Sequence, residues 1–139
     1  MSSEADAEQS KQPSGLRVLL VEDEMMVALL VESMLVELGH KVTGPVGRLN
    51  QAVAMAERED LDFAVLDVNI NGGKAYPVAA ALAARGIPFI FATGYGRAGL
   101  AAPFEDRPML QKPFRSEDLR AAIEAVYAVD TTAIARQSG

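Results

Sequence analysis

The sequence has no cysteine, no tryptophan and a single histidine, His40. Without cysteine the chain can have no disulfide scaffold, no thiolate metal site and no cysteine nucleophile. One histidine also excludes a metal site that is built from several imidazoles. Because His40 follows Gly39 at the end of a helical pattern, we read it as an exposed residue at a helix end, not as a ligand.

Long apolar runs and clusters of positive charge are missing too. No stretch approaches the ~20 apolar residues that span a bilayer, and residues 1–15 do not have the pattern of a signal peptide. With a formal net charge of −6, the chain is poorly suited to binding the phosphates of nucleic acid. Hydrophobic residues still make up 50% of the 139 residues, which is enough for the core of one domain. These features indicate a soluble, cytoplasmic protein.

Apolar runs that alternate with helical patterns predict the fold. We expect strands over 16–21, 41–44, 63–66, 87–92 and 109–111, and helices over 25–38, 49–59, 75–85 and from an N-cap at Ser116 onward. This alternation implies a parallel sheet that is covered on both faces. The expected fold class is therefore α/β, with a five-stranded doubly wound parallel sheet. The methionines should mainly fill its core.

The ends of the chain differ from its middle in composition. Residues 1–15 are rich in Ser, Glu, Gln and Pro and should form a flexible N-terminal arm. Residues 130–139 should form a loose C-terminal tail. We therefore place the domain at residues 16–129.

Polar residues follow four of the five expected strands. Glu22 and Asp23 come after the first, Asp67 ends the third, Thr93 follows the fourth and Lys112 the fifth. Taken alone, the acidic pair suits the first turn of a helix, and the other residues suit turns or ordinary surface. The carboxyl ends of parallel strands meet at one edge, however, and doubly wound sheets bind their ligands there. The joint placement therefore favours a functional site.

The residue types in this set suit phosphoryl chemistry. Three neighbouring carboxylates repel one another and favour a hard divalent cation, of which Mg²⁺ suits a site that also takes a phosphate. Asp67 can then act as a nucleophile and form an acyl phosphate. The ammonium of Lys112 can offset the charge of the transferring group, and the hydroxyl of Thr93 can donate to one of its oxygens.

Four segments carry a resemblance to a known family. They are Val18-Leu19-Leu20-Val21-Glu22-Asp23-Glu24, Ala64-Val65-Leu66-Asp67-Val68-Asn69, Thr93-Gly94 and Lys112-Pro113-Phe114. Over roughly residues 16–129 the chain resembles a receiver domain of two-component signalling. The resemblance implies a flavodoxin-like (CheY-like) three-layer sandwich.

The resemblance also implies a role for each matching residue of the metal and phosphoryl site. Glu22 and Asp23 match the acidic pair that holds Mg²⁺, and Asp67 matches the phosphorylated aspartate. Asn69 matches the position whose backbone carbonyl is a further metal ligand. Lys112 matches the lysine of the family.

Two more matches concern switching. Thr93 matches the switch hydroxyl, and Pro113 marks the cis peptide bond of the family. The strand position that usually carries a switching aromatic is Met109. We therefore expect Tyr95 either to respond to phosphate and order residues 94–107, or to pack over this loop in both states. Glycine and proline between Gly96 and Pro103 predict a short or frayed helix here.

The segment Phe91-Ala92-Thr93-Gly94-Tyr95-Gly96 is similar to the FATGUY subgroup of receivers. These occur mainly in alphaproteobacteria, often as single domains, and their partners are histidine kinases of the HWE or related groups. The resemblance implies a stand-alone response regulator that takes a phosphoryl group from a histidine kinase or phosphotransfer protein and signals by protein contact. A phosphate sink, a relay intermediate and a receiver excised from a hybrid kinase remain alternatives.

Two other classes are less well matched. A phosphatase of the haloacid dehalogenase type wants a second aspartate two residues after its nucleophile, where this chain has Asn69. A flavin-binding module wants a phosphate-binding loop after the first strand, where this chain has acids. We therefore expect a signalling protein and not an enzyme.

Overall fold

Strands and helices alternate along the chain in the computed structural model, which describes residues 13–94 and 100–138, with side chains up to residue 127. The strands are β1 (Arg17–Val21), β2 (Lys41–Val46), β3 (Phe63–Asp67), β4 (Asn69–Ile70), β5 (Gly73–Lys74), β6 (Phe89–Thr93) and β7 (Met109–Gln111). The helices are α2 (Met25–Glu37), α3 (Leu49–Arg58), α4 (Tyr76–Ala84) and α5 (Ser116–Ser138).

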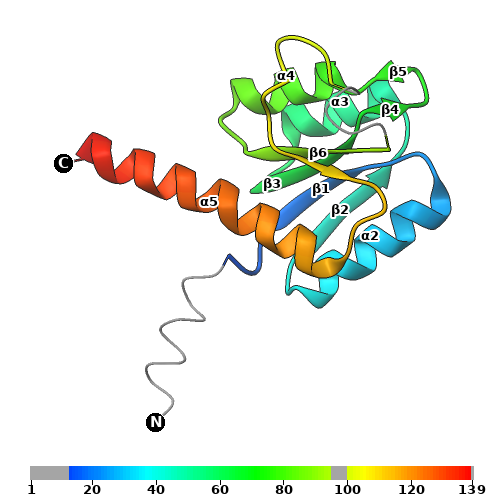
Figure 1. The fold of residues 1–139 in the computed structure, drawn as a ribbon. Helices are drawn as coiled ribbons and strands as arrows, with labels where there is room; N and C mark the ends of the chain where they lie inside the picture. Colours follow the sequence, from blue (N-terminus) through cyan, green and yellow to red (C-terminus); the bar gives the residue numbers. More distant parts are fainter. Residues whose placement is uncertain (1–12, 95–99, 139) are drawn as a thin grey trace.

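Five strands form one parallel sheet in the order β2-β1-β3-β6-β7 (Figure 1). The strand order reverses between β1 and β3, so the carboxyl ends of these two strands flank the crevice where doubly wound sheets bind ligands. The predicted α/β class and the flavodoxin-like three-layer sandwich are therefore confirmed.

The sheet is buried on both faces because alternate residues of each strand point to opposite sides. Leu19 and Leu66 face a core cluster that includes residues of α3 and α4, whereas Leu20 and Val65 face a second cluster that includes residues of α2 and α5. Figure 1 shows the two helix pairs on opposite faces of the sheet. Burial on both faces explains why the strands read as continuous apolar runs.

Predicted and observed ends of the strands and helices agree within two residues, but the last helix differs in detail. Its N-cap is Arg115 and not Ser116, because the carbonyl of Arg115 accepts from the N–H of Leu119, while Asp118 accepts from the N–H of Arg115. The helix also continues to Ser138, so residues 130–138 have helical backbone. The domain boundary at residue 129 stays a prediction, and of the N-terminal arm, residues 1–12 lie outside the described residues.

A short hairpin, β4–β5, was not predicted. Its two strands pair antiparallel directly after Asp67. Gly72 and Gly73 have φ angles of +104° and +134°, a region that favours glycine. The N–H of Leu49 donates to the carbonyl of Asn71 over 2.9 Å, which fixes the hairpin against the start of α3.

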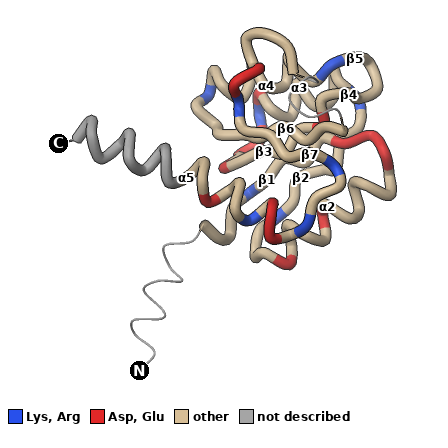
Figure 2. The backbone as a smooth tube through the Cα atoms, in the orientation of Figure 1, with Lys and Arg blue, Asp and Glu red and all other residues tan. Residues whose placement is uncertain are grey.

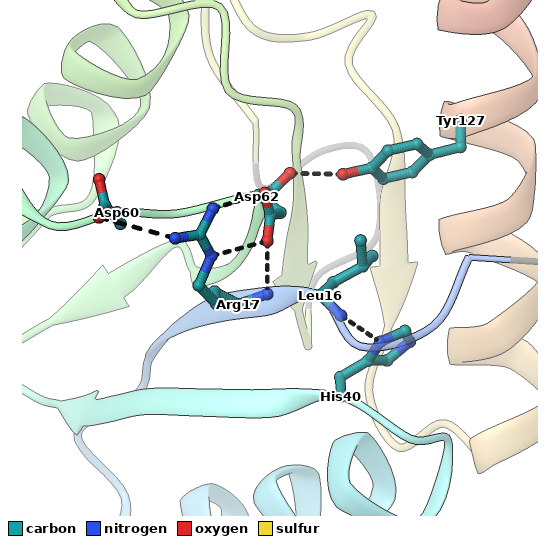
Figure 3. A network of polar contacts seen from close by, with 6 residues as sticks. All are labelled: Leu16, Arg17, His40, Asp60, Asp62 and Tyr127. Carbon is teal, nitrogen blue, oxygen red and sulfur yellow. Dashed lines mark hydrogen bonds and ion pairs between the residues drawn. The ribbon is translucent and has the colours of Figure 1, made fainter.

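The expectation that His40 is exposed was wrong. The residue is buried, with 6% of its surface exposed. Its Nδ1 accepts a hydrogen bond from the N–H of Leu16 over 3.2 Å (Figure 3). The backbone of Gly15 and Leu16 also bonds to that of Gly39 and Lys41, so the chain before β1 runs beside the ring. Burial lowers the pKa of His40.

The expectation that methionines mainly fill the core holds for Met34, Met55 and Met109, but not for the two methionines at the start of α2. Met25 and Met26 are 69% and 79% exposed, so they do not fill the core. They belong to a group of exposed apolar side chains that we call the α2 apolar face: Met25, Met26, Leu29, Leu30 and Val36. The helix buries a different stripe against the sheet, formed by Ala28, Val31, Met34 and Leu35.

The amino edge of the sheet is tied by charged and polar groups (Figure 3). The backbone N–H and Nε of Arg17 donate to Oδ2 of Asp62 over 2.8 and 3.0 Å, and Asp60 lies 3.6 Å from the same guanidinium. The hydroxyl of Tyr127 donates to the carbonyl of Asp62. These contacts join β1, the start of β3 and α5. Among the described residues, no helix has the length and apolar character needed to cross a membrane.

The burial of His40 predicts a stability change with pH. The folded protein keeps the ring neutral, whereas the unfolded chain takes up a proton near pH ~6.5. Because the pKa of His40 is lower in the folded protein than in the unfolded chain, the unfolded chain binds the proton first as the pH falls. The free energy of unfolding therefore decreases below the pKa of the unfolded chain. Thermal melts of wild type and His40→Asn, whose amide oxygen can accept from Leu16 without titrating, should diverge between pH ~7.5 and ~5.5. The wild type should lose about 2–4 °C more, and equal losses would contradict the assignment.

Candidate functional site

The carboxyl edge of the sheet gathers three acidic side chains. Glu22 and Asp23 follow β1, Asp67 ends β3, and one carboxylate oxygen of each lies within 4.8 Å of the others. Glu22 and Asp67 are 5% and 9% exposed, whereas Asp23 is exposed. Figure 2 shows the acidic stretch between β1 and α2. The structure thus brings together the three carboxylates that the sequence placed at one edge.

Lys112 brings a positive charge into this group from β7. Its Nζ donates to Oε1 of Glu22 over 2.8 Å and lies 3.4 Å from Oδ1 of Asp67. Its backbone N–H donates to the carbonyl of Thr93 over 2.8 Å, and Thr93 is completely buried at the end of β6. The peptide bond between Lys112 and Pro113 is cis, as the resemblance implied. Residues from the ends of four strands therefore meet.

The electrostatics of the group favour a further cation. Burial and the charge of Glu22 raise the pKa of Asp67 to about 7, although Lys112 opposes the shift. Burial by itself lowers the pKa of Lys112, but its hydrogen bond with Glu22 and the charge of Asp67 outweigh burial and raise it. One ammonium thus faces three carboxylates. A divalent cation would offset the remaining negative charge.

The donor set fits Mg²⁺. Carboxylate oxygens are hard ligands, and Mg²⁺ in proteins is commonly held by a few of them while it keeps several waters. Glu22, Asp23 and Asp67 are the residues that would hold it. Asn69 is exposed at the start of β4, and its side-chain oxygen accepts a hydrogen bond from Lys74. The role of its backbone carbonyl as a ligand stays a prediction.

Gly47 is a neighbour of this site that sequence reasoning missed. A Cβ atom at Gly47 would lie 2.9 Å from Cα and 3.1 Å from Cβ of Asp23. The N–H of Glu22 donates to the carbonyl of Val46 over 3.0 Å. The end of β2 therefore lies against the backbone that carries the acidic pair. The sequence shows a glycine near a proline, which predicts a turn but not this contact.

The expected switch is only partly described. Tyr95 falls in residues 95–99, which lie outside the described residues, so its role stays a prediction. Residues 100–108 contain no helix. Phe104 anchors them by stacking on Tyr76, with ring centroids 5.3 Å apart, and Met109 packs against the same core cluster.

Comparison with known proteins agrees with this geometry. The chain is 31% identical over 112 residues to the transcriptional regulatory protein PdtaR of Mycobacterium tuberculosis, across 78% of this chain and 55% of PdtaR. It thus spans about half the length of this curated relative.

Two solved structures are similar to the chain. The solution structure of SdrG from Sphingomonas melonis Fr1 has a TM-score of 0.73 and 44% identity, over 83% of this chain and 99% of that one. The receiver domain of the sensor histidine kinase PA1611 from Pseudomonas aeruginosa has a TM-score of 0.68 and 27% identity, over 81% and 98%. That structure has a magnesium ion coordinated in the active-site cleft.

Residues 18–124 match the family model described as the response regulator receiver domain. This range contains β2 to β7, all of β1 except Arg17, and all the acidic and basic residues of the carboxyl edge. More than half of the chain is matched. With the strand order and the site geometry in agreement, the chain belongs to the family of response regulator receiver domains.

Proposed function

We propose that this receiver takes a phosphoryl group onto Asp67 from the phosphohistidine of a histidine kinase or phosphotransfer protein. The observation that carries the proposal is the placement of Asp67 between two acidic residues and the ammonium of Lys112. When bound by Glu22, Asp23 and Asp67, Mg²⁺ would offset negative charge on the carboxylates and on the transferring group. The magnesium ion named for the PA1611 receiver supports this part of the proposal.

The residues of the chain suit the steps of such a transfer. A carboxylate oxygen of Asp67 bonds to phosphorus while the phosphorus–nitrogen bond of the donor breaks, and the electron pair of that bond returns to the imidazole. Lys112, 3.4 Å from Asp67, offsets charge on the phosphoryl oxygens. The hydroxyl of Thr93, at the end of the neighbouring strand β6, is the donor expected to bond to one of these oxygens.

The α2 apolar face supports a protein as the phosphoryl donor. It begins at Met25, directly after the acidic stretch, so it borders the site. Five exposed large apolar side chains on one helix are typical of a surface that a partner covers. A donor protein that presents its phosphohistidine to Asp67 can cover this face with an apolar helix.

The narrower parts of the proposal rest on the motif and on SdrG. Phe91, Ala92 and Thr93 lie on β6, and with Gly94, Tyr95 and Gly96 they match the FATGUY pattern. The match to SdrG covers 99% of that chain, which supports a stand-alone regulator. A kinase of the HWE or a related group as partner rests on the FATGUY resemblance, and the cytoplasmic location rests on the composition. The acidic net charge supports output through protein contact and not through nucleic acid. A phosphate sink or relay intermediate would use the same site.

Turnover of phosphate esters is a less favoured alternative, and the residue type at position 69 argues against it. The position two residues after Asp67 carries Asn69, whose amide oxygen accepts from Lys74, and an amide cannot act as a general acid or base as a second aspartate would. We therefore propose that the protein is not an enzyme with phosphate esters as substrates. A flavin module is disfavoured because Glu22, Asp23 and Glu24 stand where its phosphate-binding loop would follow β1.

The proposal predicts phosphorylation of one residue. With acetyl phosphate and Mg²⁺, intact-mass measurement should show one added phosphate, which should be absent in Asp67→Asn or with a chelator. Asp60→Asn, which changes an exposed acid at the opposite edge of the sheet, is the matched control and should be phosphorylated like wild type. If Asp67→Asn still incorporated phosphate, Asp67 would not be the phosphorylated residue. Steady release of phosphate from an aryl phosphate would favour the phosphatase alternative.

The α2 apolar face predicts a difference between donors. Met26→Gln and Leu29→Gln change exposed side chains, so the fold should be kept. Transfer from the phosphorylated kinase should slow by about tenfold or more, since each replacement weakens an apolar contact with the partner. Phosphorylation by acetyl phosphate, which needs no docking surface, should be unchanged. Equal rates from the kinase in wild type and variants would exclude this face from docking.

The raised pKa of Asp67 predicts a second pH dependence, opposite in sign to that of His40. The folded protein holds a proton on Asp67 up to pH about 7, whereas the unfolded chain releases it near pH ~3.9. Stability without metal should therefore fall as the pH rises through this window. Asp67→Asn should raise the melting temperature by roughly 3–6 °C at pH ~8 and by less at pH ~5. The expected increase is modest because water partly screens the charges of the site. Added Mg²⁺ should stabilise wild type only. If Asp67→Asn were less stable than wild type at pH ~8 without metal, repulsion among the carboxylates would not be the cause of the pH dependence.

A further inference from the structure

We propose that Gly47 is a positioning residue for the metal site, because the absence of a side chain there sets where Asp23 holds its carboxylate. The inference rests on the proposed binding of Mg²⁺ by Glu22, Asp23 and Asp67. It assigns a role at that site to a residue that is not itself a ligand.

The space at Gly47 is limited by backbone and not by flexible side chains. A Cβ atom there would lie 2.9 Å from Cα of Asp23 and 3.3 Å from the carbonyl oxygen of Glu22. No rotamer change can relieve a contact with a Cα atom. A methyl group at Gly47 therefore has to displace the backbone of the acidic pair or the end of β2.

Conformation is not the reason for glycine at this position. Gly44, three residues earlier, has a φ angle of +104°, where an L side chain is strained, but Gly47 does not adopt this left-handed region. An alanine could take the backbone conformation of Gly47. The requirement for glycine thus comes from its distance to Asp23.

The end of β2 is held in place on two sides. Val46 pairs with Val21 and accepts from the N–H of Glu22 over 3.0 Å, and its own side chain is 5% exposed. On the other side, the N–H of Leu49 donates to the carbonyl of Asn71. Asp23, in contrast, is exposed at the start of the connection to α2. Displacement should therefore fall on Asp23 more than on β2.

Such a displacement bears directly on metal binding. The three carboxylates have oxygens within 4.8 Å of one another, a spacing that a shift at Asp23 changes. Mg²⁺ demands near-ideal octahedral geometry, with ligand distances of ~2.0–2.1 Å. Residues that hold ligands in place typically change metal affinity by about 10–100-fold when mutated. The geometry at Gly47 thus sets the affinity of the site without supplying a ligand.

The test compares Mg²⁺ affinity in the metal-free full chain of wild type, Gly47→Ala and Gly86→Ala, by calorimetric titration and thermal melts. Gly86→Ala makes the same chemical change at a φ angle of +71°, with nothing within 4 Å, on an exposed turn before β6. We expect Gly47→Ala to bind Mg²⁺ about tenfold more weakly or worse, while its metal-free melting temperature stays near wild type. Gly86→Ala should lose stability but bind Mg²⁺ like wild type.

Each other outcome overturns a defined statement. Equal Mg²⁺ affinity in Gly47→Ala and wild type removes the positioning role while leaving the proposed function intact. A Gly47→Ala protein that does not fold without metal assigns the glycine to the fold, which also overturns the proposal. If wild type itself does not bind Mg²⁺, the proposed function fails and this inference fails with it.

Discussion

The contact between Lys112 and Glu22 is the interaction on which the site depends. It links the end of β7 to the end of β1, and it places the same ammonium 3.4 Å from Asp67 on β3. One positive charge thereby allows two buried carboxylates to lie side by side, but it does not balance them and the nearby exposed Asp23. Burial and the remaining repulsion from Glu22 raise the pKa of Asp67, and the excess of negative charge favours the binding of a cation.

Aspartates at the two edges of the sheet have pKa shifts of opposite sign. At the amino edge, Arg17 binds Asp62 through its backbone and its guanidinium, and these hydrogen bonds lower the pKa of Asp62 (Figure 3). At the carboxyl edge, burial and the charge of Glu22 raise the pKa of Asp67. Hydrogen bonds of Arg17 and Tyr127 join β1, the start of β3 and α5 at the amino edge, whereas the carboxyl edge keeps buried acidic groups at the site proposed for phosphoryl transfer.

Much of this arrangement could be predicted because it follows from periodicity and topology. The apolar runs fix the strands, their alternation with helices fixes a parallel sheet, and that sheet brings Glu22, Asp67 and Lys112 to one edge. The burial of His40 could not be predicted, since the chain that covers the ring lies before β1 in the sequence. The closeness of Gly47 to Asp23 depends on a distance between two loops, which a sequence pattern does not carry. The exposure of Met25 and Met26 could not be predicted either, because an apolar residue on a helix can pack in the core or contact a partner protein.

Asp67, the proposed acceptor of the phosphoryl group, can be identified chemically. Reduction with borohydride converts an aspartyl phosphate to homoserine, so peptide mass mapping after phosphorylation by the cognate kinase locates the acyl phosphate directly. We expect homoserine at Asp67 alone, and only when Mg²⁺ is present during phosphorylation. Homoserine at Asp23 or another aspartate, or its absence from a chain that carries phosphate, would contradict the account.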